Sequence, residues 1–205
     1  MKRYWFAIAF VAIGLGGCAK QLPPLQFTPN NVGVSTTKLP AEVRSITVSI
    51  APEGEQQGEV ETMFTEAGGA MGSGTSLTDT WEGAIEESLA RMAIFTDRAP
   101  QTVSIAVKVL KLDVPAMGIS MTTDTVAKYE IIDRSNGDII FSQDITSQGT
   151  TPGDYDFLGV VRARESVNRS VKNNVLAFLQ ALETVDLKRP MFPAPSKPDR
   201  SAPSS

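Results

Sequence analysis

The sequence predicts an α+β domain, a two-layer sandwich in which an antiparallel sheet carries two helices on one face. Three features of the sequence support this fold class. Several segments alternate apolar and polar residues with the period of a strand, and two others repeat apolar residues with the period of a helix. Asn136-Gly137 joins two alternating segments, which is a strong hairpin signal. The resulting order is β-α-β-β-β-α, with the sheet as one layer and the helices as the other.

The first predicted strand spans residues 43–51, where Ile46, Val48 and Ile50 alternate onto one face. Residues 52–75 are polar or small and show no apolar period. We expect this segment to form a mobile arm on the domain.

The first predicted helix starts at Ser76 and continues to about residue 93. Asp79 follows Ser76 at the spacing of a capping box, in which the N-cap hydroxyl satisfies a free backbone N–H. The apolar residues of this helix fall on one face, and we expect Trp81, in the middle of that face, to be buried against the sheet. The face comprises Leu77, Trp81, Ala84, Ile85, Leu89 and Met92.

Three further strands and a second helix follow. Residues 101–114 alternate, residues 120–133 extend as a long strand, and residues 138–148 return after the Asn136-Gly137 turn. The last helix is predicted to open at Asp154 and to end near residue 184. Its apolar face comprises Phe157, Val160, Val161, Val167, Val171, Val175, Phe178 and Leu182.

The first 17 residues have the pattern of a secretory signal peptide. Lys2 and Arg3 precede an apolar run, Tyr4 to Leu15, that is too short to span a bilayer. The run ends in Leu15-Gly16-Gly17-Cys18, which resembles the lipobox of bacterial lipoproteins. An ordinary signal peptide followed by a chance cysteine is the alternative.

The lipobox resemblance implies cleavage between Gly17 and Cys18, lipidation of Cys18 and acylation of the new amino terminus. Several acyl chains together give stable membrane attachment. The residue after the cysteine is Ala19 rather than the aspartate that retains Gram-negative lipoproteins in the inner membrane. The expected location is therefore the outer membrane, with the protein facing the periplasm.

The rest of the chain divides into three parts. Residues 18–41 contain the lipidated cysteine and four prolines, and they are expected to form a semi-extended tether. Residues 42–186 form one periplasmic domain. Residues 187–205 are rich in proline and are expected to be disordered.

The composition excludes several classes of function. Cleavage removes Lys2 and Arg3 from 19 basic residues and leaves 17 against 23 acidic ones, a net charge of −6. An acidic chain without a basic stretch is a poor ligand for nucleic acid. There is no histidine and one cysteine, which excludes histidine-based catalytic triads and the usual zinc sites. We expect no cofactor, no metal and no enzymatic activity.

The glycine-rich stretch at residues 68–76 resembles a phosphate loop but fails its requirements. Thr75 occupies the position of the essential lysine, and the preceding residues are acidic instead of forming a buried strand. We therefore expect no nucleotide site there. Paired acids at Glu86-Glu87 and at Asp154 and Asp156 are expected to be structural, because adjacent helical residues point apart and helix N-termini favour negative charge.

Two sets of residues are candidates for contacting a partner. Met63 and Phe64 lie in the predicted arm, where they either pin the arm to the domain or bind a partner. Arg162, Arg169 and Lys172 share the outer stripe of the last helix. They form either a solvated face or a site for a lipid headgroup or an acidic partner.

The anchor, the tether and the small domain together resemble the small outer-membrane lipoproteins of envelope transport and assembly. These include YajG-like lipoproteins, the auxiliary lipoproteins of ABC-type lipid transporters and the lipopolysaccharide-assembly lipoprotein. The resemblance, over residues 43–184, is one of architecture and implies a non-enzymatic module that binds a protein or lipid partner in the periplasm. Two other functions stay open: an envelope hydrolase that uses carboxylates, and a structural lipoprotein whose tail contacts the cell wall.

Overall fold

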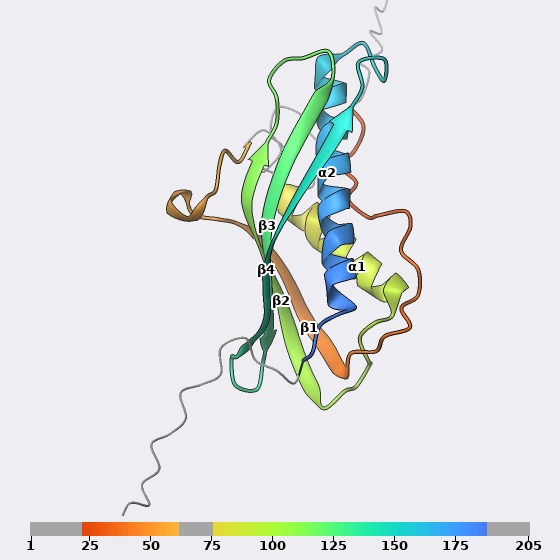
Figure 1. Cartoon of the computed structure of the whole chain (residues 1–205), viewed down its shortest axis with the longest axis vertical. Coiled ribbons are helices and arrows are strands. Elements are labelled where there is room, and N and C mark those ends of the chain that lie inside the picture. The colour runs from red at the N-terminus through yellow and green to blue at the C-terminus, as the bar shows by residue number, and fades with distance from the viewer. Residues whose placement is uncertain (1–21, 62–75, 188–205) are drawn as a thin grey trace, which may run out of the picture.

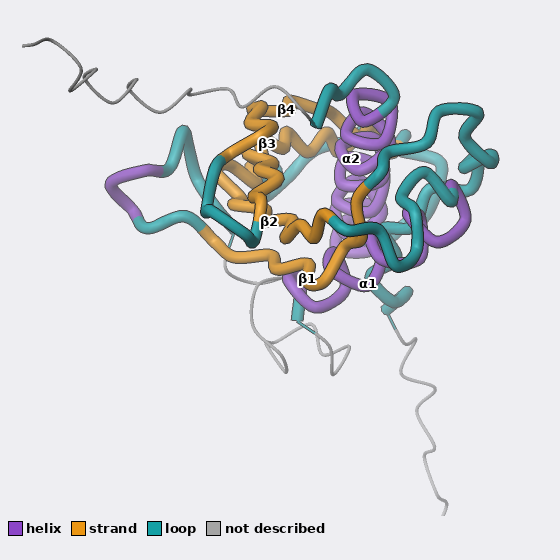
Figure 2. The backbone as a smooth tube through the Cα atoms, turned by 90° about the horizontal axis from the view of Figure 1, so that it is seen from below, coloured by secondary structure: helices purple, strands orange, loops and turns teal. Residues whose placement is uncertain are grey.

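A four-stranded sheet in the order β1-β2-β3-β4 forms one layer, and two helices pack on one of its faces (Figures 1 and 2). The computed structural model describes residues 22–61 and 76–187. The predicted α+β class and the order of elements are confirmed, and the sheet is open and mixed. The elements are β1 (Ala41–Ile50), the short 3-10 helix η1 (Glu53–Glu55), α1 (Leu77–Met92), β2 (Gln101–Asp113), β3 (Met121–Asp133), β4 (Ile139–Thr151) and α2 (Gly159–Leu182).

The sheet is not entirely antiparallel, so this part of the prediction is wrong. β1 pairs with β2 in parallel, with Ile46 opposite Ile105 and Val48 opposite Val107. The β2–β3 and β3–β4 pairs are antiparallel. Because α1 lies in the connection between β1 and β2, the chain returns to the end of the sheet from which β1 started. An alternating pattern fixes which face a residue occupies, but it does not fix the direction of the strand.

The start of α1 and the burial of Trp81 are as predicted. The Ser76 hydroxyl accepts a hydrogen bond from the Asp79 amide at 3.0 Å. Ala93 ends the helix in a left-handed conformation, with φ of 48°. Trp81 is fully buried, and its ring meets the edge of Phe27 with 6.1 Å between the ring centres.

The hairpin between β3 and β4 is also confirmed, whereas the last helix starts later than predicted. Gly137 has φ of 79°, a conformation that suits glycine. α2 begins at Gly159, not at Asp154, because the chain first makes a turn in which the Asp156 carboxylate accepts a hydrogen bond from the Leu158 amide. Phe157, expected in the core, is therefore 81% exposed.

The predicted tether is part of the folded body from residue 22 onward. Phe27 and Leu39 are buried in the main core. The Ser35 amide donates to the Met92 carbonyl and the Leu39 amide donates to the Ile94 carbonyl, both at 2.8 Å. The sequence pattern did not reveal this packing, because the prolines interrupt any regular repeat of apolar residues. The apolar side chains between the prolines are nevertheless buried.

The described part of the predicted arm is also ordered by hydrogen bonds. The Gln57 amide donates to the Leu110 carbonyl, and the Glu61 amide donates to the Leu112 carbonyl. Val60 forms a parallel bridge with Leu112, so the chain continues beside β2 after β1 ends. The expectation of a mobile arm therefore does not hold for residues 52–61. Residues 62–75 lie outside the described part, as do residues 188–205 of the predicted tail.

We expect amide hydrogen exchange to distinguish this packing from a free tether. The amides of Ser35, Leu39, Gln57 and Glu61 should exchange at least about a hundredfold more slowly than in an unstructured chain, since each is bonded to a backbone carbonyl. Mass spectrometry of the exchanged full chain would measure this. If the Ser35 and Leu39 amides exchanged at the rate of an unstructured chain, the segment that contains them would be a free tether.

Among residues 22–61 and 76–187, no helix combines the length and the apolar character that crossing a bilayer requires.

Candidate interaction surface

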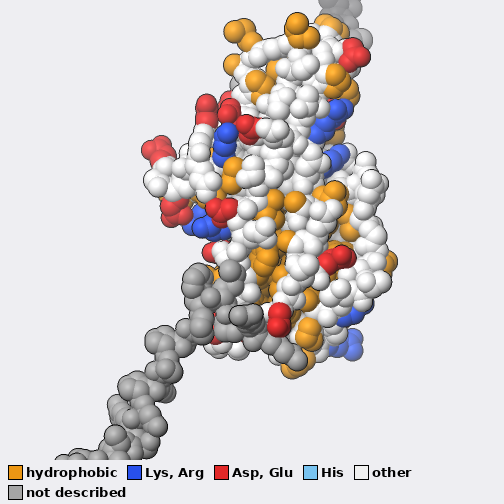
Figure 3. Space-filling model, in the orientation of Figure 1, with side chains coloured by type: hydrophobic (Ala, Val, Ile, Leu, Met, Phe, Trp, Pro, Cys, Tyr) orange, Lys and Arg blue, Asp and Glu red, His pale blue; other side chains and the backbone are white. Residues whose placement is uncertain are grey.

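Exposed hydrophobic side chains gather at one end of the domain. The described residues expose five large hydrophobic side chains, and four of these lie in just two loops. Met117 and Ile119 belong to the β2–β3 loop, and Tyr155 and Phe157 belong to the β4–α2 loop. Both loops lie at the upper end of the sheet in Figure 1, where Figure 3 shows hydrophobic side chains on the surface. We call these four residues the apolar tip.

The two loops of the apolar tip contact each other closely. A Cβ atom on Gly153 would lie 2.6 Å from the Ile119 side chain, so glycine is what allows this approach. The guanidinium of Arg162, in the first turn of α2, donates to the Asp156 carbonyl in one loop and to the Gly118 carbonyl in the other. Arg162 therefore fixes the two loops relative to each other and to α2.

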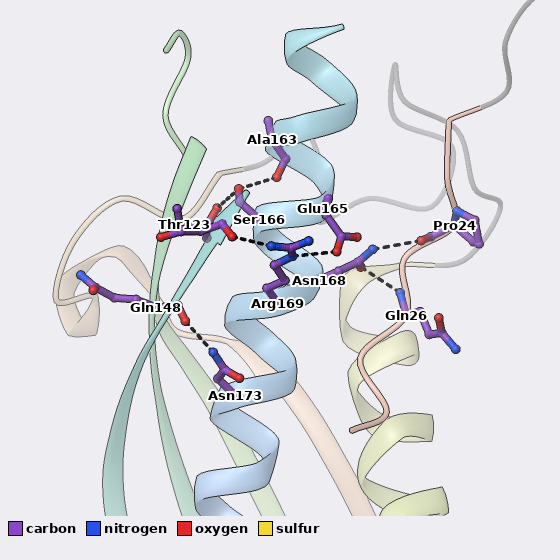
Figure 4. Close-up of polar contacts among 11 residues, drawn as sticks. Pro24, Gln26, Thr123, Gln148, Ala163, Glu165, Ser166, Asn168, Arg169 and Asn173 are labelled. Carbon is purple, nitrogen blue, oxygen red and sulfur yellow. Dashed lines mark hydrogen bonds and ion pairs between the residues drawn. The ribbon is translucent and has the colours of Figure 1, made fainter. Parts of the chain in front are cut away.

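Arg169 supports the same end of the molecule about two helical turns further along α2. Its guanidinium donates to the Glu165 carboxylate and to the Thr150 carbonyl, both at 2.8 Å (Figure 4). The guanidinium also lies over the Tyr155 ring, 5.5 Å from the ring centre. A cation in this position holds an aromatic ring by electrostatic attraction. The side chain thus orients Tyr155 within the apolar tip.

Beneath the tip, α2 rests on the sheet through small hydroxyl residues instead of large apolar ones. The buried pair Thr123–Ser166 has hydroxyl oxygens 2.7 Å apart (Figure 4), and so does the buried pair Thr125–Ser170. At Gly149 a Cβ atom would lie only 2.1 Å from the Ser170 amide nitrogen. The close approach of α2 to β3 and β4 at these residues sets the position of α2, and therefore the position of Arg162 and Arg169.

A buried hydrogen-bonded chain joins both helices to the sheet further down. The Trp81 indole donates to the Tyr129 hydroxyl at 3.2 Å, and that hydroxyl donates to the Asn174 side chain at 2.9 Å. Asn174 in turn donates to the Ile145 carbonyl at 2.8 Å. Burial raises the pKa of Tyr129, so the hydroxyl stays protonated as a donor. With Trp81, Tyr129 and Asn174 all buried, this chain is structural and is not open to a substrate.

The first described residues are fixed to the same half of α2. Asn168 donates to the Pro24 carbonyl at 3.3 Å and accepts from the Gln26 amide at 2.9 Å (Figure 4). From there toward residue 22, the chain runs to the end of the molecule that carries the apolar tip (Figure 1). Sequence reasoning missed this contact, because a lone asparagine on a helix is ordinarily a surface residue.

A second candidate surface is a groove of about 450 Å³ between the edge strand β1 and the outer side of α1. Its apolar lining includes Ile46, Leu89 and Phe95, and its charged lining includes Glu86. Glu87, the neighbour of Glu86, instead accepts a hydrogen bond from Thr28. The two carboxylates thus serve different surroundings and do not form an acid–base pair.

The structure brings together only some of the predicted partner-binding residues. Arg162 and Arg169 support the apolar tip, while Lys172 is half-buried further along α2. Their partner-binding role stays a prediction, and the two arginines have the internal role described above. Gly17 and Cys18, the predicted cleavage and lipidation positions, lie outside the described residues, as do Met63 and Phe64.

Charged and titratable groups elsewhere serve local structure. The hydroxyl and amide of Ser135 hold the pKa of Asp133 below its usual range. Burial lowers the pKa of the Arg164 guanidinium, a residue that the sequence did not single out. Within the described ranges, no cluster of three or more His, Cys, Asp or Glu side chains is placed to hold a metal ion.

No protein-family model matches the chain, and no curated protein matches it in sequence. Among solved structures, the chain is similar to a DUF330 protein from Xanthomonas campestris, with a TM-score of 0.49 and 9% identity over 78% of this chain and 92% of that one. A candidate lipoprotein from Caulobacter crescentus gives a TM-score of 0.38 and 11% identity over 51% and 78% of the two chains.

Lipoprotein GNA1162 from Neisseria meningitidis gives a TM-score of 0.25 and 14% identity over 39% of this chain and 47% of that one. All three TM-scores lie below 0.5, and the identities are too low to transfer a function.

Proposed function

We propose that this protein is a lipid-anchored lipoprotein of the bacterial envelope that acts, without catalysis, as a binding module in envelope transport or assembly. The observation that carries the proposal is the position of the described chain relative to Cys18. The Pro24 carbonyl is already fixed to Asn168 of α2, so only six peptide steps separate the anchor from the folded body. An extended chain of this length spans at most about 21 Å. The domain therefore works at the membrane surface and not at the end of a long tether.

The outer membrane is the proposed location, because Ala19 follows the lipidated cysteine where an aspartate would favour retention in the inner membrane. The surfaces available to a partner are the apolar tip and the groove beside β1. The exposed hydrophobic side chains of the apolar tip suit a binding surface, which favours binding over the alternative of a carboxylate hydrolase.

The two alternatives predict different outcomes in simple experiments. A carboxylate hydrolase would act on an envelope substrate in purified form, and a structural lipoprotein would crosslink to the cell wall through residues 187–205. A binding module would instead copurify with an envelope transporter or an outer-membrane barrel after crosslinking in intact cells.

The anchor is tested first by Cys18→Ser. This variant lacks the thiol that accepts the lipid, so we expect it to lose metabolic labelling with a fatty acid and to accumulate as the unprocessed precursor. Gly17→Ala is the matched control, since it keeps a small residue at the cleavage junction and should be labelled and processed normally. Full labelling of Cys18→Ser would contradict lipidation at this residue.

Sorting is tested in the same series by Ala19→Asp. An acidic residue directly after the lipidated cysteine is expected to move most of the protein from the outer-membrane fraction to the inner-membrane fraction on a density gradient. Labelling of this variant should be unchanged. An unaltered distribution between the two membranes would contradict the assignment to the outer membrane while leaving the anchor itself in place.

A further inference from the structure

We infer that the apolar tip inserts into the interface of the membrane that holds the Cys18 lipids, so that the domain rests on the bilayer with its β2–β3 and β4–α2 loops. This inference rests on the proposed function for the anchor, and it adds a second contact with the membrane made by the folded body. The partner is a lipid surface of low charge, for the reasons given below.

The first reason is the exposure of the tip residues. Met117 is 88% exposed, Ile119 85%, Phe157 81% and Tyr155 46%. A single exposed hydrophobic side chain on a soluble domain needs no explanation, but a group of them on adjacent loops marks an interaction surface. The group combines aliphatic side chains with a tyrosine, whose apolar ring and polar hydroxyl suit the boundary between water and acyl chains.

The second reason is that the tip is held in an exposed arrangement. The bonds from Arg162 to the Gly118 and Asp156 carbonyls keep the two loops together, and the Arg169 guanidinium holds the Tyr155 ring. These contacts join backbone carbonyls and the Tyr155 ring to α2, so they leave the apolar side chains of the tip exposed. The tip therefore needs no rearrangement before it meets a membrane.

The third reason is distance from the anchor. Pro24 is bonded to Asn168, which lies nine residues after the start of α2 at Gly159. Nine residues of helix rise about 14 Å. The six peptide steps from Cys18 to Pro24 can cover up to about 21 Å. A bilayer that holds the lipids on Cys18 is thus within reach of the tip.

The fourth reason is the charge around the tip, which decides the kind of lipid surface. Residues 114–120 and 152–158 contain Asp154 and Asp156 and no lysine or arginine. Two cations of α2 lie beside the tip: Arg162 is bonded to backbone carbonyls, and Arg169 is bonded to the Glu165 carboxylate and the Thr150 carbonyl. A basic surface would draw the protein to anionic lipid, and this end has none. The tip therefore fits a zwitterionic surface, which it enters by burying apolar area.

The test places a probe on the tip of the full, lipidated protein. Cys18 is the single cysteine of the chain, so after lipidation an introduced cysteine is the one free thiol. Met117→Cys and Phe157→Cys would each carry an NBD fluorophore, whose emission shifts to the blue in an apolar medium. The proteins are reconstituted into phosphatidylethanolamine–phosphatidylcholine vesicles with and without a nitroxide on the acyl chain.

Val34→Cys is the matched control. Val34 is also a large exposed hydrophobic residue, at 74%, but it lies beside the last turns of α2 near Gln180. That is about 31 Å along the helix from Gly159. We expect both tip probes to be shifted to the blue and quenched by the nitroxide at least about threefold more strongly than the Val34→Cys probe. Replacing part of the lipid by phosphatidylglycerol should not increase this difference.

Three results would overturn the inference. One is tip emission equal to that in water. Another is tip emission that is blue-shifted without quenching by the nitroxide, which would mean that a protein surface, or a second copy of this chain, covers the tip. The third is insertion that requires anionic lipid. Fatty-acid labelling of the same samples separates the two proposals. If the protein is labelled but the tip probes emit as in water, insertion alone is refuted. If the protein is not labelled but the nitroxide quenches the tip probes, the anchor alone is refuted.

Discussion

Replacing Trp81 by alanine is expected to lower the free energy of unfolding by about 3–5 kcal/mol. The side chain is fully buried, packs against the edge of Phe27, and donates the hydrogen bond that starts the chain through Tyr129 and Asn174. Alanine would leave a cavity between α1, the N-terminal segment and the sheet. A domain of this size is stable by only about 5–15 kcal/mol, so the variant should be close to unfolding at 37 °C. Urea denaturation followed by circular dichroism measures the difference.

Trp81→Phe is the control for this prediction. Phenylalanine keeps most of the apolar volume and removes the N–H that Tyr129 accepts, so the cost should be much smaller, about 1 kcal/mol. Once residues 1–17 are removed, Trp81 is the one tryptophan left in the chain, and its emission should be blue-shifted and protected from iodide. Equal losses for the two variants, or free quenching, would contradict the burial of this side chain against the sheet.

Gly149→Ala is expected to cost about 3 kcal/mol or more, at the upper end of what overpacking a core costs. The added Cβ would lie 2.1 Å from the Ser170 amide nitrogen and 2.5 Å from the Ser166 carbonyl oxygen. Both are backbone atoms of α2, so neither can rotate away, and the helix itself has to move off the sheet. The Thr123–Ser166 and Thr125–Ser170 pairs would lengthen with it. Thermal unfolding of the variant should show the loss directly.

Gly83→Ala gives the matched control. Gly83 lies in the exposed part of α1, and a Cβ atom there meets nothing within 4 Å. Since alanine favours the helix over glycine, this variant should be more stable than the natural protein by about 0.5–1 kcal/mol. If Gly149→Ala and Gly83→Ala changed the stability in the same direction, the close approach of α2 at Gly149 would be disproved.

The regular elements could be predicted because each carries its own period or boundary residue. Trp81 was placed correctly by the helical repeat of α1, and the β3–β4 turn was placed by Asn136-Gly137, whose glycine has the positive φ that the turn needs. The apolar face of α2 was also correct from Val161 onward. The first turn of the predicted helix was wrong, because the Asp156 carboxylate accepts a hydrogen bond from the Leu158 amide in a separate turn before the helix starts.

The features that sequence reasoning missed depend on contacts between distant segments. The parallel direction of β1 is set by the connection through α1, which leaves no mark on the alternation of Ile46 and Val48. Phe27 is buried against Trp81 of α1, a contact between positions 54 residues apart. The apolar tip was missed for a similar reason: Met117 and Phe157 are 40 residues apart, and nothing local to either indicates that the two loops meet.

The parallel pairing of β1 with β2 has a consequence for the order in which the chain can fold. β2, β3, β4 and α2 follow one another over residues 101–182, so they can assemble through short loop closures. β1 has to find a partner 60 positions away, since Ala41 pairs with Gln101, and contacts of such long range form slowly. The amino-terminal segment is synthesised first and yet is completed last. Phe27 and Leu39 are thus exposed until β2 arrives, and exposed apolar side chains make a partly folded chain prone to aggregation.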